Sequence, residues 1–136
     1  MNETDVRRVL SHHRTMIGSD GIPGSEAPHP RLWGTFPRVL GHYSRNVGLL
    51  SLESAVHKMT GLTASVFGFK DRGILKRGAV ADITIFDPET IIDRATFEDP
   101  TQTSVGIKHV IIGGEVVLED GIQMNTRPGR IVQRIN

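Results

Sequence analysis

The sequence has 136 residues, with 16 basic and 15 acidic side chains and a formal net charge of +1 at pH 7. This length fits about one ordinary domain, and the balanced charge argues against nucleic-acid binding, which needs a concentrated excess of Lys and Arg. No stretch approaches the roughly 18 apolar residues of a membrane span. With a polar N-terminus and no cysteine, these features predict a soluble, cytoplasmic protein without disulfides or thiolate metal ligands.

The first half of the chain is predicted to hold helices around one buried strand. Residues 4–13 have apolar side chains at helical spacing and begin with Thr4, which can cap a helix. The apolar run from Thr15 to Gly21 ends in a small polar turn, which suits a strand of a parallel sheet. Residues 21–37 contain four prolines and no periodicity, so they are predicted to form a loop that lines a site.

The remaining elements divide the chain near Gly68 to Arg72. Further helical segments are predicted at Val39–Arg45, at Leu52–Met59 behind a Ser51 cap, and at Thr63–Phe67. Strands are predicted at residues 81–87, 107–112, 115–118 and 131–135. Gly113 and Gly114 separate two β-branched runs, as in a two-residue hairpin turn with positive φ. The second half is therefore predicted to be all β.

The predicted strand at Thr15 to Gly21 has a consequence for the whole chain. One parallel strand cannot form a sheet, because its backbone groups and its apolar faces need neighbours that this sequence does not supply. The first half is therefore predicted to be a piece of a larger α/β fold.

Three segments together resemble one family. They are Met16–Gly21 followed by His29–Gly41, Ala55–Thr60 running on to Gly73–Asp82, and Pro100–Gln102 followed by Gly106–Gly114. The second pattern is similar to the amidohydrolase superfamily in general. The first is similar to a narrower group, the D-aminoacylases and N-acyl-D-amino-acid deacylases. The resemblance covers nearly all 136 residues in consistent order.

This resemblance implies a fold and an activity. Residues 1–70 would be the C-terminal portion of a (β/α)8 metal-dependent hydrolase barrel, with its last strand, its flanking helices and a substrate loop at 21–37. Residues 71–136 would be strands of the small β-sandwich domain. The implied reaction is deacylation of N-acyl-D-amino acids, in which zinc-activated water hydrolyses a linear amide bond. The chain would be an incomplete fragment, completed by the rest of the barrel in cis or as a separate chain.

Asp20 is the predicted catalytic residue. Ser19-Asp20-Gly21 alone is typical of a turn. The resemblance implies an aspartate at the end of the eighth strand that takes a proton from the metal-bound water and passes it to the departing nitrogen. A metal ion lowers the pKa of its water to about 7, so a nearby carboxylate can act as the base. Asp20 is also considered as a weak metal ligand or a group just outside the ligands.

Three residues of the loop are predicted to bind substrate. Arg31 can hold the free carboxylate of an N-acyl amino acid bidentately, although a loop-stabilising role is an equal alternative. His29 can reach the site, and Trp33 can wall a pocket or anchor the loop. No histidine pair has zinc-ligand spacing, and the resemblance implies that the zinc ligands belong to earlier barrel strands absent from this sequence.

Two other interpretations stay open. The chain could be a non-catalytic remnant or a split subunit that needs a partner chain. It could instead come from a hydantoinase-like or dihydroorotase-like enzyme, which would share the Ala81-Asp82 region but not the His29–Gly41 segment. Under every interpretation the isolated chain is expected to be inactive.

Overall fold

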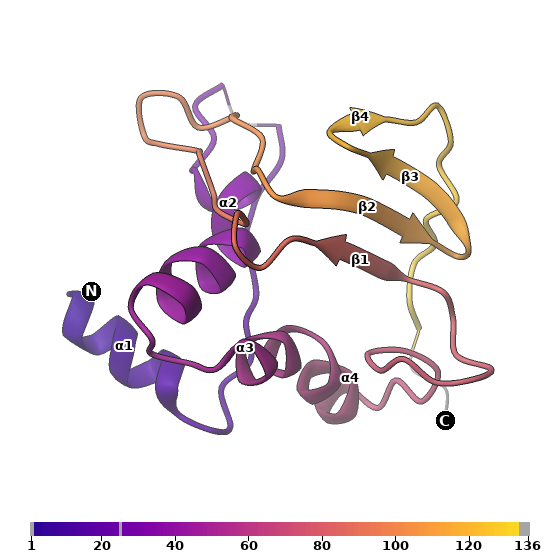
Figure 1. Cartoon of the computed structure of the whole chain (residues 1–136), viewed down its shortest axis with the longest axis horizontal. Coiled ribbons are helices and arrows are strands. Elements are labelled where there is room, and N and C mark those ends of the chain that lie inside the picture. Colours follow the sequence, from indigo (N-terminus) through magenta and orange to yellow (C-terminus); the bar gives the residue numbers. More distant parts are fainter. Residues whose placement is uncertain (1, 25, 134–136) are drawn as a thin grey trace.

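The structure, a computed structural model, describes residues 2–24 and 26–133. Helices make up its first half: α1 (Glu3–Ser11), α2 (Arg31–Arg38), η1 (Val39–Asn46), α3 (Leu52–Met59) and α4 (Gly61–Phe67) (Figure 1). The second half holds β1 (Ile83–Phe86), β2 (Ile107–Ile112), β3 (Glu115–Glu119) and β4 (Ile122–Gln123). These strands form one sheet in the order β1-β2-β3-β4, and all of its pairings are antiparallel.

Helix α1 begins one residue earlier than the sequence predicts. Asn2, and not Thr4, is the cap, because its side-chain oxygen accepts a hydrogen bond from the Asp5 backbone at 2.9 Å. The helix ends at Ser11, since His12 has an extended backbone with ψ of 129°.

The prediction of a strand from Thr15 to Gly21 is wrong for this structure. The segment is irregular backbone, and the Ile17 N–H donates to the carbonyl oxygen of Lys58, in α3, at 3.2 Å. Ile17 is nevertheless buried and belongs to the hydrophobic core. The physical reason is that a ladder needs a neighbouring strand, and the described sheet lies in the other half of the chain.

The predicted loop at 21–37 is also partly wrong, because its residues from Arg31 onward lie in helix α2. Pro30 stands at the helix start with φ of −51°, close to the value that its ring imposes in any case. Pro37 lies inside the helix, and only Arg38 separates it from the π-helix η1. At the end of η1, the Val47 N–H donates to the carbonyl of His42, five residues back, at 2.9 Å. The prolines favoured the prediction of a loop, although Pro30 and Pro37 stand at positions where this helix accommodates them.

The later elements follow the sequence more closely. Helix α3 begins behind Ser51, whose hydroxyl accepts the Ser54 N–H, and α4 covers the predicted turn at 63–67. Strands β2 and β3 join through Gly113 and Gly114, which have φ of 58° and 89°. The short β4 was not predicted. Residues 131–133 of the predicted last strand are not in a strand, and 134–135 lie outside the described residues.

The two halves meet where the turn after β1 packs on η1. Ile91 is buried in this turn, in one cluster with Val39 and Leu40. Gly41 permits the close approach, since a Cβ there would lie 2.3 Å from the Ile91 carbonyl oxygen. The Arg45 guanidinium donates to the same carbonyl at 2.8 Å. No helix within the described residues combines the length and the apolar character that crossing a membrane requires.

Candidate active site

Asp20 and Arg31 form an ion pair at the surface. Arg31 Nη2 lies 3.0 Å from Asp20 Oδ2, and the Asp20 side chain is 81% exposed. Asp20 has a left-handed backbone with φ of 48°, which is uncommon for a residue other than glycine. The Gly21 N–H donates to the Ser19 hydroxyl, so the aspartate stands in a tight turn. The structure therefore brings the predicted base and the predicted carboxylate-binding residue together.

One hydrogen-bond donor of Arg31 has no partner in the described structure. This donor is the Nε of Arg31, which is buried. A buried donor without an acceptor costs on the order of 1–3 kcal/mol. A carboxylate bound through Nε and Nη2 would satisfy both groups in the fork geometry that guanidinium favours.

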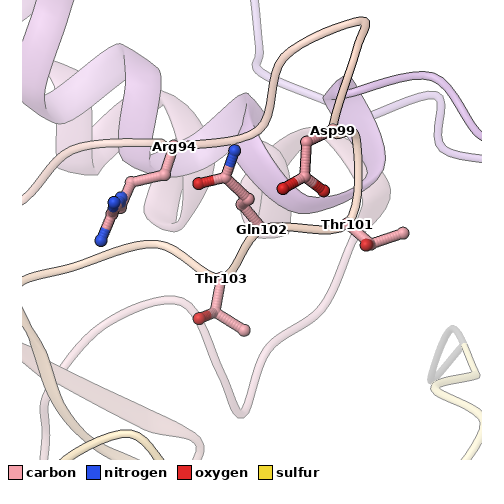
Figure 2. A pocket seen from close by; sticks show the side chains of 5 residues that line it. All are labelled: Arg94, Asp99, Thr101, Gln102 and Thr103. Atoms are coloured by element: carbon pink, nitrogen blue, oxygen red, sulfur yellow. The ribbon is translucent and has the colours of Figure 1, made fainter.

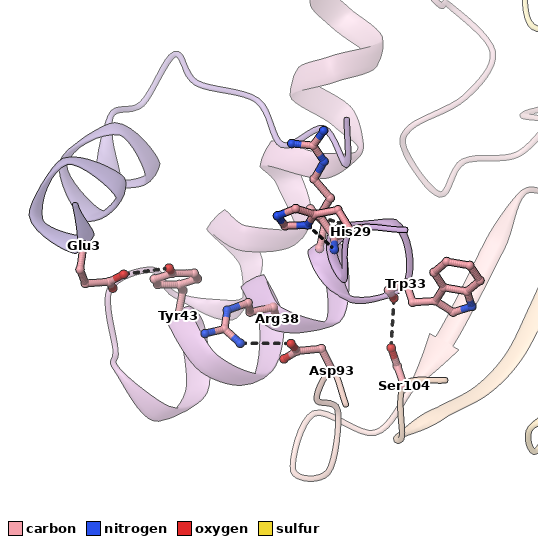
Figure 3. Close-up of polar contacts among 9 residues, drawn as sticks. Glu3, His29, Trp33, Arg38, Tyr43, Asp93 and Ser104 are labelled. Atoms are coloured by element: carbon pink, nitrogen blue, oxygen red, sulfur yellow. Dashed lines mark hydrogen bonds and ion pairs between the residues drawn. The ribbon is translucent and has the colours of Figure 1, made fainter. Parts of the chain in front are cut away.

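The ring of His29 contacts the backbone of Arg31. Its Nδ1 accepts the Arg31 backbone N–H at 3.0 Å, and the ring is exposed (Figure 3). The Phe97 ring meets that of His29 edge-on, with centroids 5.0 Å apart. Sequence reasoning missed Phe97, because nothing in its local pattern connects it with His29.

Trp33 does not join this group in the way that a substrate wall would require. Its carbonyl accepts a hydrogen bond from the Ser104 hydroxyl at 3.4 Å, and Figure 3 shows its indole directed away from His29. Five residues after Trp33, the Arg38 guanidinium donates to Asp93 at 3.1 Å. Burial alone would lower the pKa of Arg38, but the hydrogen bond and charge of Asp93 raise it above its ordinary value. Both contacts fasten α2 to the loop after β1.

Lys58 makes hydrogen bonds to the segment that precedes Asp20. It is buried, and its ammonium group donates to the carbonyl of His12 at 2.5 Å and to that of Thr15 at 3.0 Å. The Thr15 hydroxyl is a further acceptor at 3.1 Å. Burial lowers the pKa of Lys58. Together with the bond from Ile17 to the Lys58 carbonyl, these contacts tie residues 12–17 to the end of α3.

Metal binding is not supported by this chain alone. Among residues 2–24 and 26–133, no three His, Cys, Asp or Glu side chains lie close enough to hold a metal ion. Asp20 could supply one carboxylate, but the donor set that zinc requires is not formed by the described residues.

Two cavities in the described part of the chain lie outside the site. One of about 370 Å³ lies in the loop between β1 and β2, and Figure 2 shows its lining of Arg94, Asp99, Thr101, Gln102 and Thr103. The other, of about 250 Å³, is lined by residues of α1, of the 16–18 segment and of the α2–η1 helix. Neither lining contains Asp20 or Arg31.

Comparison with known proteins places these residues in a family. The amidohydrolase family profile matches residues 2–118. Two proteins of Alcaligenes xylosoxydans xylosoxydans are similar over 134 residues, which is 98% of this chain: a D-aminoacylase at 54% identity and an N-acyl-D-glutamate deacylase at 52%.

A solved structure agrees with these matches. The N-acyl-D-glutamate deacylase from Bordetella bronchiseptica, complexed with zinc and a phosphonate mimic of the tetrahedral intermediate, is 49% identical over 99% of this chain, with a TM-score of 0.89. The chain spans only 28% of that protein, and 28% and 27% of the two Alcaligenes proteins. The match to the profile and the agreement of fold establish that the chain belongs to the amidohydrolase family.

Proposed function

We propose that this chain is part of a metal-dependent deacylase of N-acyl-D-amino acids, in which Asp20 acts as the base and Arg31 binds the free carboxylate of the substrate. The deacylases among its relatives support the reaction class. The observation that carries the residue roles is the 3.0 Å ion pair between the exposed Asp20 carboxylate and the partly exposed Arg31 guanidinium.

The ion pair suggests how binding prepares the base. An exposed pair contributes about 0–1 kcal/mol, so a second carboxylate can displace Asp20 from Arg31 at little cost. The incoming carboxylate would also engage the unpartnered Nε. Asp20 would then be free to accept a proton from the attacking water and return it to the departing nitrogen.

The rest of the catalytic machinery is assigned to the remainder of the enzyme, in cis or in another chain. We propose that residues 1–70 close a (β/α)8 barrel and that residues 71–136 belong to a flanking β-sandwich. The 15–21 segment, which pairs with no strand in the described structure, supports the first assignment, because its remaining backbone groups would find partners in a neighbouring barrel strand. Zinc, present in the Bordetella relative, would bind through ligands from that remainder. The cytoplasmic location remains a prediction from composition.

The test is a graft of this chain into a complete enzyme. The 134 residues of this chain that align with the Alcaligenes D-aminoacylase would replace the matching 28% of that protein, giving what we call the grafted enzyme. We expect it to release D-amino acids from N-acetyl-D-amino acids, to leave the L-enantiomers intact, and to ignore cyclic ureides. Release only from cyclic ureides would favour a hydantoinase-like enzyme, and an inactive but folded graft would favour a non-catalytic remnant.

The chain by itself provides the companion measurement. We expect the purified chain to retain no zinc after dialysis and to show no deacylase activity until the missing part of the barrel is added as a second polypeptide. A compact, zinc-loaded and active preparation of the chain alone would contradict the assignment of metal ligands to the remainder.

A further inference from the structure

The loop between β1 and β2 is fastened to the segment that carries Arg31. We call residues 93–104 the cover loop. Its first residue, Asp93, pairs with Arg38 at 3.1 Å, and its last, Ser104, donates to the Trp33 carbonyl at 3.4 Å. Gly34 allows the contact, since a Cβ there would lie 3.0 Å from the Cβ of Asp93. Figure 1 shows this orange loop beside the violet segment that precedes α2.

Between these two anchors, the cover loop presents Phe97 at the tip of a turn. The Thr96 N–H donates to the Asp99 carbonyl, and the Asp99 N–H donates to the Thr96 hydroxyl, each at 3.0 Å. Phe97 is 77% exposed and makes its ring contact with His29. A large apolar side chain held at a turn in this way is available for contact with a ligand.

We propose that Phe97 and His29 form an aromatic wall that receives the side chain of the D-amino acid and selects neutral, apolar side chains. The inference rests on the proposed function. His29 accepts the Arg31 backbone N–H, so the wall lies beside the group that would hold the α-carboxylate. The scissile amide faces Asp20, which leaves the side chain as the other large substituent of the α-carbon. The acyl chain lies beyond the amide carbonyl, further from Arg31.

The charges of the cover loop agree with a neutral side chain. Arg94 is its only basic residue, against Glu98 and Asp99, while Asp93 is already paired with Arg38. Arg94 and Asp99 also line the same 370 Å³ cavity, so no net positive charge gathers there. A second carboxylate, such as that of a D-glutamate side chain, would meet a net negative loop. Overall identity does not decide this point, since the D-aminoacylase and the N-acyl-D-glutamate deacylase are 54% and 52% identical to this chain.

The experiment compares substrate ratios in the grafted enzyme. The Phe97→Ala variant is assayed on N-acetyl derivatives of D-phenylalanine, D-leucine, D-glutamate and D-alanine, and on N-hexanoyl-D-alanine. We expect the kcat/KM ratio of D-phenylalanine over D-alanine to fall about tenfold, as for the loss of apolar pocket contact. The ratio of hexanoyl to acetyl substrate should not change, and Phe97→Tyr should restore most of the preference. Leu75→Ala, at an 83% exposed apolar residue outside the cover loop, is the matched control and should change neither ratio.

Each other outcome overturns the inference in a distinguishable way. Equal loss on all substrates would mean that Phe97 only supports Arg31 through His29. A loss confined to the hexanoyl substrate would assign the wall to the acyl chain, and unchanged ratios would remove Phe97 from the site. A parent graft without any deacylase activity would contradict the proposed function itself, and the inference with it.

Discussion

The Thr15–Gly21 segment and the β2–β3 hairpin satisfy their backbone groups in opposite ways. In the hairpin, each strand finds its partner across Gly113 and Gly114, so its hydrogen bonds are local. The Thr15–Gly21 segment depends on contacts with α3, more than 40 residues away in sequence. The site region therefore depends more than the hairpin does on contacts with residues that are distant in the sequence. Asp20 stands at the end of a segment whose geometry depends on distant residues.

Among the substitutions outside the proposed base itself, the one at Arg31 has the largest expected effect. In the grafted enzyme, Arg31→Lys should lower kcat/KM for N-acetyl-D-leucine roughly 100-fold, or about 2.7 kcal/mol, because an ammonium group cannot hold a carboxylate bidentately. The loss should appear mainly in KM. Arg7→Lys, at an exposed arginine of α1, is the control. An unchanged KM would leave Arg31 with a loop-stabilising role only.

One substitution in α3 removes the hydrogen bonds that Lys58 makes to His12 and Thr15. Lys58→Met keeps an unbranched side chain, one heavy atom shorter, but leaves the acceptors of His12 and Thr15 without their donor. We expect local opening of residues 12–17 to become about 2 kcal/mol easier, so that the Ile17 amide exchanges roughly 30-fold faster. The Asp120 amide, which donates to Lys108 in the hairpin region, is the internal control. Equal acceleration of both amides would mean that the two regions open as one unit.

A substitution in the hairpin should weaken the hairpin alone. Gly113 has φ of 58° and open space around it, so Gly113→Ala adds backbone strain without a clash. We expect a cost of about 1–2 kcal/mol, seen as faster exchange of the Asp120 amide and unchanged exchange at Ile17. Gly129→Ala, at a glycine with open space and no left-handed φ, serves as the control. Faster exchange at Ile17 would contradict the independence of the two regions.

The smallest effect tests the turn that joins the halves. The backbone N–H of Glu89 and the hydroxyl of Thr90 lower the pKa of Asp87 below its ordinary 3.8. A carboxyl with a lowered pKa stabilises the fold above that ordinary value, and this contribution is lost as the pH falls through the lowered pKa. Parent and Asp87→Asn chains should therefore differ in urea midpoint at pH 7 and converge as the pH falls below 3.8. A constant difference across this range would mean that the carboxylate charge contributes nothing.

Elements with local signals could be predicted from the sequence. The Ser51 cap, the alternation in β1 and the Gly113–Gly114 turn all depend on residues close to one another. The Thr15–Gly21 segment was misjudged because a strand is defined by a partner as much as by its own residues. Helix α2 was hidden by prolines that its start and its π-helical continuation accommodate.

The candidate site shows the same difference between residues with local signals and residues whose contacts are distant in the sequence. The role predicted for Asp20 came from the family resemblance and that for Arg31 from the geometry of its guanidinium, and the structure adds that the two side chains touch. The contacts of Asp93 and Ser104 span 55 and 71 residues, and no short-range pattern could reveal them. The same holds for Phe97 beside His29.

The most direct test of the proposed mechanism is the kcat of the Asp20→Asn variant of the grafted enzyme on N-acetyl-D-leucine. An amide of the same shape can still approach Arg31 but cannot accept the proton, so we expect a fall of about 1,000-fold with the zinc content unchanged. A kcat within about tenfold of the parent would show that the proton passes through another group, and Asp20 would then be only a turn residue paired with Arg31.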